Sequence, residues 1–279
     1  MKLAGILVAA LFLLSGCYRQ NYYLSPFQSN SNTYHVMPLK SDSVLSASYL
    51  HGGIATGGSN DYRDNVFAFT SEYYRANSFG SFEAFYGANF SLGSYNVKNY
   101  LYSSSSSLSD SFTVKTINDM AGKKFFGGYG FKGGIALVVP YSKRGGEWRV
   151  LGVEINMQNE FGQYLNFRKH LPDSVAQANT NASFFPTICF TTEAVARSKH
   201  FALSYKLSVG GSFRKDNLNY LPNPARNGEP FKAPGFFGQT INYTRDKGWS
   251  IYDQLTFASH AVFFQLGFII QLRHLKNLK

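Results

Sequence analysis

The sequence is poor in cysteine and in charge, and beyond its first residues it has no long apolar run. It contains 2 cysteines, Cys17 and Cys189, and 15% of its residues are charged. After Leu14 no window reaches the roughly 20 apolar residues of a spanning helix, which excludes a helical membrane protein. If Cys17 is chemically modified, Cys189 is the only thiol left, and an intrachain disulfide is excluded as well.

Motifs for metals, cofactors and catalysis are also scarce. The histidines form no H-x-x-x-H pair and no spacing with carboxylates that would bind zinc, and no G-x-S-x-G elbow occurs. The string from Gly128 to Gly133 matches G-x-G-x-x-G, but it opens a predicted strand and no helix follows to hold a pyrophosphate. We therefore expect no metal, no cofactor and no enzymatic activity. The histidines are His35, His51, His170, His200, His260 and His274.

Aromatic residues and glycine are abundant instead. The chain has 26 Phe, 19 Tyr and 26 Gly, with Asn, Asp and Ser spread between them. These are the residue types of strands and turns. The composition therefore predicts an all-β protein.

The first residues form an export signal. Lys2 precedes an apolar run from Leu3 to Leu14, which is too short for a mature spanning helix. The tetrad Leu14-Ser15-Gly16-Cys17 resembles the lipobox of bacterial lipoproteins, which implies cleavage before Cys17 and acylation of its thiol and its new amine. We expect a signal peptide at 1–16, and acyl chains on Cys17 that hold the protein to the membrane. The alternative is an ordinary secretory signal that ends in Cys.

Residues 17–42 show no sustained period and are predicted to be a lipidated tether that leads to the first strand. In cell-surface lipoproteins of the Bacteroidota, the modified Cys is usually followed by several acidic residues. Here Tyr18-Arg19-Gln20-Asn21 follows Cys17, which departs from that pattern. The departure indicates an anchor on the periplasmic side.

From residue 43 onward, apolar side chains alternate with small or polar ones, the period of a strand with one apolar face. In one segment Phe82, Tyr86 and Phe90 share a face, and Glu83 and Asn89 fall on the other. Several segments reach the 9 to 11 residues with which a tilted strand spans a bilayer. The predicted strands are 43–51, 65–76, 81–95, 127–140, 147–158, 184–196, 201–214, 234–245, 249–258 and 261–272.

Charges in the middle of these strands sit on the second, small and glycine-rich face. In a narrow barrel such side chains would meet across the lumen, where opposite charges can pair. A soluble sheet would tolerate the same face in water, so the pattern favours a membrane barrel only modestly. The charged residues are Glu72, Glu83, Lys132, Glu154 and Lys206.

The links between the predicted strands alternate between long and short, as in outer-membrane barrels with long loops on one side and tight turns on the other. Ten strands would place both chain ends on the tight-turn, periplasmic side. The turns and the tail are basic, and the net charge is +11. We interpret this as attraction to anionic headgroups rather than to nucleic acid, and ordinary solvated turns are the alternative. The basic residues are Lys143, Arg144, Arg197, Lys199, Arg245, Lys247, Arg273, Lys276 and Lys279.

By signal, period and loop alternation, the chain resembles outer-membrane β-barrel lipoproteins of the Bacteroidota. The resemblance implies a single antiparallel up-and-down transmembrane β-barrel of about ten strands over 43–279, in the cell outer membrane with the N-terminus on the periplasmic side. Such barrels commonly end in an aromatic residue, whereas here Leu272 precedes a basic tail. A barrel of this size would be largely filled by side chains, so we expect no wide pore.

We expect a non-enzymatic structural or accessory envelope protein that contacts membrane lipid, and an envelope protein partner through its long loops or basic periplasmic rim. Two alternatives stay open. One is a lipid-modifying barrel enzyme, for which Ser259 with His260, or Ser204 with His200, are the candidate pairs. The other is a lipid-tethered soluble β-sandwich or lipocalin-like binding protein.

Overall fold

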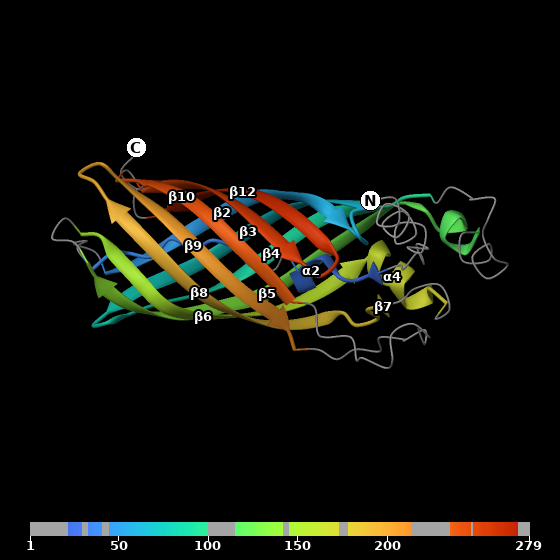
Figure 1. Cartoon of the computed structure of the whole chain (residues 1–279), viewed down its shortest axis with the longest axis horizontal. Helices are drawn as coiled ribbons and strands as arrows, with labels where there is room; N and C mark the ends of the chain where they lie inside the picture. The colour runs from blue at the N-terminus through green and yellow to red at the C-terminus, as the bar shows by residue number, and fades with distance from the viewer. Residues whose placement is uncertain are drawn as a thin grey trace, which may run out of the picture.

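The computed structural model describes residues 22–29, 33–40, 45–99, 115–141, 145–172, 178–213, 235–246 and 248–272. Ten strands form a closed barrel in which every neighbouring pair is antiparallel, and β12 pairs with β2 to complete the ring (Figure 1). The strands are β2 (Ser46–Ser59), β3 (Asp64–Phe79), β4 (Phe82–Val97), β5 (Gly122–Pro140), β6 (Glu147–Gly162), β8 (Phe184–Arg197), β9 (Phe201–Ser212), β10 (Gly235–Arg245), β11 (Trp249–Ala258) and β12 (Ala261–Gln271).

The alternation of side chains predicts the strands well, with one clear difference in β2. This strand continues to Ser59 through a glycine-rich stretch, so the long loop expected at 52–64 is only the turn at 60–63. Glycine is needed there because a Cβ on Gly57 would meet the carbonyl oxygen of Val262 and the ring of Phe263 on the paired strand. The stretch lacks alternating side chains because the neighbouring strand lies too close.

The barrel is apolar outside and polar inside. Phe82, Tyr86 and Phe90 are 43%, 59% and 45% exposed on the outer face, whereas Glu83 and Asn89 are buried in the lumen. Leu203, Phe264 and Phe268 also lie on the outer face. Because a soluble sandwich or lipocalin would enclose these side chains, that alternative is wrong. The closed ring and its apolar outer surface define a transmembrane β-barrel.

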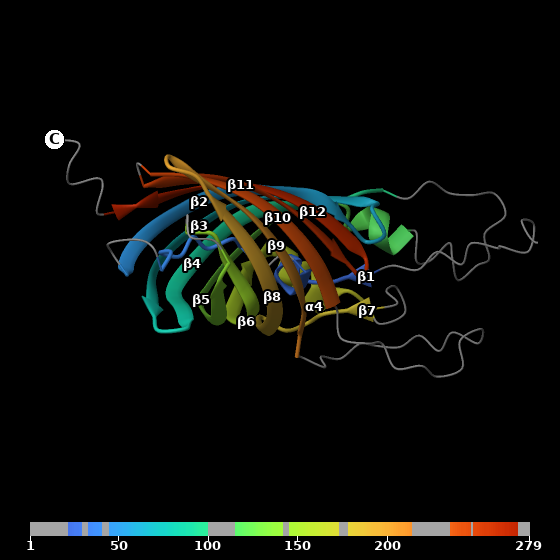
Figure 2. The ribbon, with the colours of Figure 1, turned by 60° about the vertical axis from the view of Figure 1, so that its left-hand side comes forward.

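The two ends of the barrel differ in their connections. At one end, the loop end, lie the links 98–121, 163–183 and 213–234 together with the short turns 60–63 and 259–260. At the other, the turn end, lie 80–81, 141–146, 198–200 and 246–248. The predicted alternation of long and short links is therefore confirmed at three of the loop-end connections. Figure 2 shows α4 (Gln163–His170) and β7 (Ala178–Asn179) at the loop end.

Helices are few and short in the part of the chain that the structure describes. Residues 115–119 form one turn of helix, and α4 is the longest. Within the described ranges, no helix has the length and apolar character to cross a membrane.

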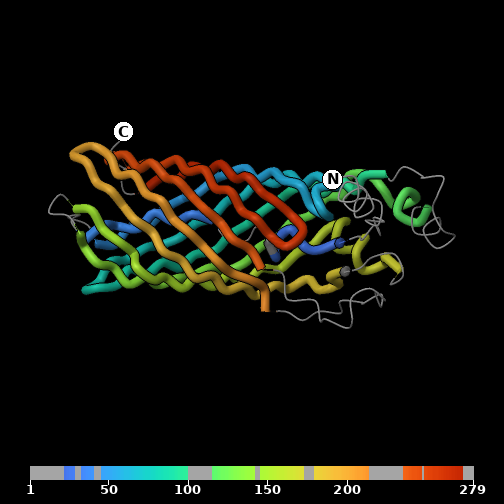
Figure 3. Tube along the Cα trace, in the orientation of Figure 1, coloured from blue at the N-terminus to red at the C-terminus, as the bar shows by residue number. Residues whose placement is uncertain are grey.

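The lumen holds the N-terminal part of the described chain. This luminal segment, residues 22–29 and 33–40, includes β1 (Tyr22–Tyr23), which pairs in parallel with β7, and α2 (Pro26–Ser29). Tyr23 is fully buried and His35 is 2% exposed. In Figure 3 the blue trace of this segment runs inside the wall of strands.

The path of the luminal segment corrects one expectation. Tyr22 lies at the loop end, where its backbone N–H donates to Asn60 Oδ1 over 2.8 Å, whereas β12 finishes at the turn end. The prediction that both chain ends lie at the turn end is therefore wrong for the described N-terminal residues. The predicted number of ten strands is confirmed. An even number of strands places the start of the first strand and the end of the last at the same end of the barrel, but it does not place a segment that crosses the lumen before the first strand. The expected tether at 17–42 is thus largely a packed part of the barrel, as far as it is described.

Candidate functional site in the lumen

The loop end of the lumen is closed by aromatic packing. The ring of Tyr95 stacks on Tyr164 at 3.8 Å, and Phe27 of the luminal segment meets the edge of Phe126 at 5.7 Å. Burial raises the pKa of the Tyr164 hydroxyl above its usual range, so it stays protonated and donates to the carbonyl of Leu24. We name this loop-end cluster the seal. Its large members are Tyr23, Phe27, Tyr95, Ile117, Phe126, Tyr164, Phe167, Leu171, Phe185 and Phe263.

A buried arginine ties α4 into the seal. Arg168 is fully buried, donates to Glu160 Oε2 over 2.5 Å and to the carbonyl of Thr180 over 2.7 Å, and lies over the Tyr164 ring. The backbone N–H of Thr180 in turn donates to the carbonyl of Tyr23 over 3.3 Å. The helix, the wall and the luminal segment are therefore locked together at this end.

Glu72 on β3 holds the middle of the luminal segment. One oxygen lies 2.7 Å from His35 Nε2, and the other accepts a bond from the Thr33 hydroxyl over 2.9 Å. Lys132 on β5 reaches the same carboxylate at 3.4 Å and Thr33 at 2.7 Å. A buried carboxylate needs such partners, because desolvation without them costs several kcal/mol. Glu72 and its partners thus hold the luminal segment in place, and Lys132 balances the charge of the Glu72 carboxylate.

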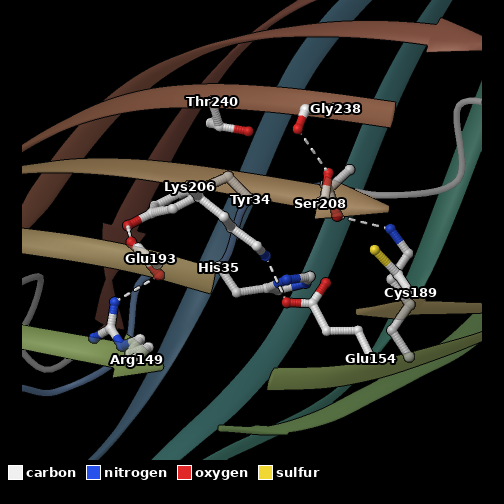
Figure 4. A network of polar contacts seen from close by, with 12 residues as sticks. Tyr34, His35, Arg149, Glu154, Cys189, Glu193, Lys206, Ser208, Gly238 and Thr240 are labelled. Atoms are coloured by element: carbon white, nitrogen blue, oxygen red, sulfur yellow. Dashed lines mark hydrogen bonds and ion pairs between the residues drawn. The ribbon is translucent and has the colours of Figure 1, made fainter. Parts of the chain in front are cut away.

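Arg149 on β6 joins two further strands and the segment. Its guanidinium contacts Glu83 at 2.6 Å and Glu193 at 2.8 Å, and all three side chains are buried. The Tyr34 hydroxyl donates to Glu193 over 2.6 Å and lies 2.7 Å from the hydroxyl of Ser204. Figure 4 shows Arg149 and Glu193, which stand on the neighbouring strands β6 and β8, together with Tyr34 of the luminal segment.

Lys206 and Glu154 form the last pair of the lumen, at 2.5 Å (Figure 4). The prediction that mid-strand charges pair inside the lumen is therefore confirmed for Glu72 with Lys132 and for Glu154 with Lys206, although each pair joins strands that are only one strand apart in the wall. Glu83 also pairs, but with Arg149. Sequence reasoning missed Arg149 and Glu193, although both occupy polar positions between apolar neighbours in their strands.

A cavity of about 520 Å³ remains at the turn end. Its floor is the luminal segment from Tyr34 to Leu39, and its wall comes mainly from β8 to β12. Asn242 is 2% exposed, lines this cavity, and its Oδ1 has no hydrogen-bond partner. Three further spaces between described lumen side chains are much smaller, at about 10 Å³ each. Polar members of its wall are Ser204, Thr244 and Ser250.

The mouth of the cavity carries the described part of the predicted basic rim. Arg197 and Arg245 line it, with Asp246 beside them, and Lys199 lies in the adjacent exposed turn. Asp246 is 4.0 Å from His200. Lys143, Arg144, Lys247, Arg273, Lys276 and Lys279 lie outside the described residues, as do Cys17 and the signal.

In one candidate pair, the serine and the histidine lie in different surroundings. Ser204 is buried and bonded to Tyr34, while His200 is at the exposed turn. His260 uses Nδ1 for Asp61 at 2.8 Å, and its ring stacks on Tyr22 at 3.5 Å. The geometry of the described residues thus gives these histidines other partners.

The glycine string in β5 has a packing explanation. Gly128 lies within the strand, and a Cβ there would be 2.4 Å from Cζ of Phe27 and 2.6 Å from Nε2 of Gln158. Glycine therefore makes room for the luminal segment, and no helix follows the string. Among the described residues, no three His, Cys, Asp or Glu side chains are grouped so that they could hold a metal ion.

Comparison with known proteins identifies no family. No family model matches the chain, and no curated protein matches it. Among solved structures, it overlaps in part with the translocator domain of the autotransporter NalP from Neisseria meningitidis, at 10% identity and a TM-score of 0.32, covering 83% of this chain and 90% of that one.

Two further overlaps are of the same kind. The transport unit of the autotransporter AIDA-I from Escherichia coli has 10% identity and a TM-score of 0.36, with 88% of this chain and 95% of that one covered. An outer membrane channel from Pseudomonas putida F1 has 7% identity and a TM-score of 0.36, with 85% and 100% covered. Likenesses this slight carry no functional argument, and the fold class rests on the strand order and the apolar outer face.

Proposed function

We propose that this chain is a non-enzymatic outer-membrane lipoprotein, a barrel sealed by its own N-terminal segment, with an accessory role in the cell envelope. The observation that carries the proposal is the occupied lumen: the seal closes one end, and contacts of Thr33, Tyr34 and His35 with charged residues of the wall hold the segment through the middle. A conducting pore or a translocation path would need the space that Phe27, Tyr34 and His35 fill. The membrane assignment is supported by the closed ring of antiparallel strands and its apolar outer face.

The turn-end cavity is the part of the lumen left for a partner. Its volume lies within the range of about 300 to 1,000 Å³ that ligand sites occupy. Arg197 and Arg245 at the mouth favour an acidic group, and the unpartnered Asn242 Oδ1 favours a hydrogen-bond donor. We therefore propose that an envelope protein inserts a short acidic segment here. In outer-membrane barrels short turns face the periplasm, which makes this a periplasmic contact.

A conductance measurement tests the sealed barrel. Wild-type protein in a planar lipid bilayer should show no steady ion current. A variant in which residues 22–40 are replaced by a Gly/Ser linker of equal length should conduct. The replacement removes the side chains of the luminal segment that fill the lumen and complete the seal. The matched control replaces residues 216–231, in the loop between β9 and β10, by a Gly/Ser linker of equal length and should stay closed.

Two results would contradict the proposal: a steady current through the wild type, or a closed barrel after replacement of 22–40. A heat-shifted gel band shows that each variant is folded. If the replacement prevents folding, the double substitution Tyr23→Gly with Phe27→Gly thins the seal and should raise the leak instead. A turnover assay on labelled phospholipid tests the rival enzyme, which would release product in proportion to protein.

A further inference from the structure

The luminal segment crosses the barrel in the direction opposite to β2. At the loop end, Tyr22 is held by Asn60 and stacks on His260. At the turn end, the backbone N–H of Lys40 donates to Glu147 Oε1 over 2.5 Å, and its Nζ donates to the carbonyl of Val138 over 3.0 Å. The chain therefore enters the described barrel at the loop end, descends through the lumen, and turns back into the wall.

The point of entry lies at a low part of the rim. Asn60 and His260 belong to 60–63 and 259–260, the two shortest connections of the loop end, and these turns are neighbours because β12 pairs with β2. Asp61 bonds to His260 through both backbone and side chain, which fixes the two turns together. The three long links join other strands, so the described rim beside Tyr22 is formed by these two short turns.

An aromatic side chain marks the same place. Tyr62, in the turn beside Asn60, is 63% exposed. Tyrosine at a barrel rim is typical of the interface between headgroups and hydrocarbon. There the ring contacts hydrocarbon and the hydroxyl contacts headgroups and water. The rim where the luminal segment enters is therefore near the membrane interface.

The chain length outside the barrel then decides which leaflet Cys17 can reach. Four residues separate Cys17 from Tyr22, so their Cα atoms lie five steps and at most about 18 Å apart. The hydrocarbon core is about 30 Å thick, so this length cannot return to the far leaflet. Resting on the proposed lipidation, we infer that the acyl chains of Cys17 lie in the leaflet at the loop end, beside the turns 60–63 and 259–260. With turns facing the periplasm, this is the outer leaflet, and the protein carries a surface-side anchor threaded through its own barrel.

Labelling with a membrane-impermeant maleimide polyethylene glycol on intact cells tests the inference. Three single cysteines are placed in a Cys189→Ala background: Asn21→Cys near the anchor, Ser105→Cys in a long loop, and Lys279→Cys after the last strand. We expect Asn21→Cys and Ser105→Cys to shift on a gel from intact cells, and Lys279→Cys to shift only after the outer membrane is permeabilised. Asn21→Cys that shifts only together with Lys279→Cys overturns the inference.

Failure of the lipid anchor gives a different result. Incorporation of a clickable palmitate analogue should be seen in the wild type and lost in Cys17→Ala. If the wild type takes up no analogue, the anchor is refuted and the leaflet assignment falls with it. An unacylated Cys17 thiol would itself react with the maleimide. The three single cysteines are then labelled with Cys17→Ala also present, and their pattern still reports which end the segment enters. If the analogue is incorporated and Asn21→Cys is protected in intact cells, lipidation stands and the threaded anchor is wrong.

Discussion

The two ends of the lumen are built differently. The loop end is packed with rings from the wall, from α4 and from the luminal segment, whereas the turn end keeps a cavity of about 520 Å³ over the same segment. Between them the segment is held by charged side chains. In the described residues, the lumen is therefore packed at the loop end and hollow at the turn end. A barrel that must conduct would be open, or openable, at both ends.

The largest effect is expected from the charges between the two ends. Arg149→Met leaves Glu83 and Glu193 buried without their shared cation, which should lower the free energy of unfolding by about 5 kcal/mol. Urea unfolding in lipid vesicles, followed by the heat-shifted gel band, measures it. Arg75→Met is the matched control, since Arg75 is exposed and bonds only to Ser46, and should cost less than about 1 kcal/mol. Equal losses in the two variants would show that the lumen charges do not hold the fold.

The next effect sharpens the contrast at the seal. Phe126→Ala removes a ring that is 1% exposed and packs on Phe27, and should cost about 3 to 4 kcal/mol because a cavity is left behind. Phe131→Ala on the same strand removes a ring that is 70% exposed to lipid and should cost about 1 kcal/mol. The same unfolding titration compares them. A larger loss for Phe131 would place the packed core outside the barrel.

The smallest effect is expected beside the cavity. Ile269→Ala, at a 1% exposed position, should cost about 2 kcal/mol, the low end for such a change, because the side chain borders the cavity on one side although it packs in a buried cluster with Tyr34 and Tyr252 on the other. Ile270→Ala on the lipid side of β12 is the control, at about 1 kcal/mol. If Ile269→Ala costs as much as Phe126→Ala, the turn end is packed as tightly as the seal.

Much of the wall could be predicted from the sequence, because a strand with lipid on one side and a polar lumen on the other alternates strictly. Residues 82 to 92 show this pattern and form β4 as expected. The exception was the glycine-rich end of β2, where close approach of β12 removes the side chains that would alternate. Charge pairing across the lumen was also predictable, since Glu72 and Lys132 stand on the polar face of their strands.

The luminal segment could not be predicted by period, because a chain that crosses a lumen has contacts on all sides. A compositional signal was present. Tyr22, Tyr23 and Phe27, followed by Tyr34 and Val36, are too apolar for a solvated tether. The cavity could not be predicted either, because it depends on the segment lying nearer to some strands than to others.

An engineered disulfide tests most directly whether the N-terminal segment enters at the loop end. Tyr23 and Asn179 are register partners of β1 and β7, and neighbouring strands lie about 4.8 Å apart, which suits a disulfide. In a Cys189→Ala background, Tyr23→Cys with Asn179→Cys should form an internal bond in the membrane-inserted protein, seen as a mobility change that a reductant reverses. The threaded account predicts this bond and none between Tyr23→Cys and Ser250→Cys at the turn end. Cross-linking to position 250 and not to 179 would contradict it.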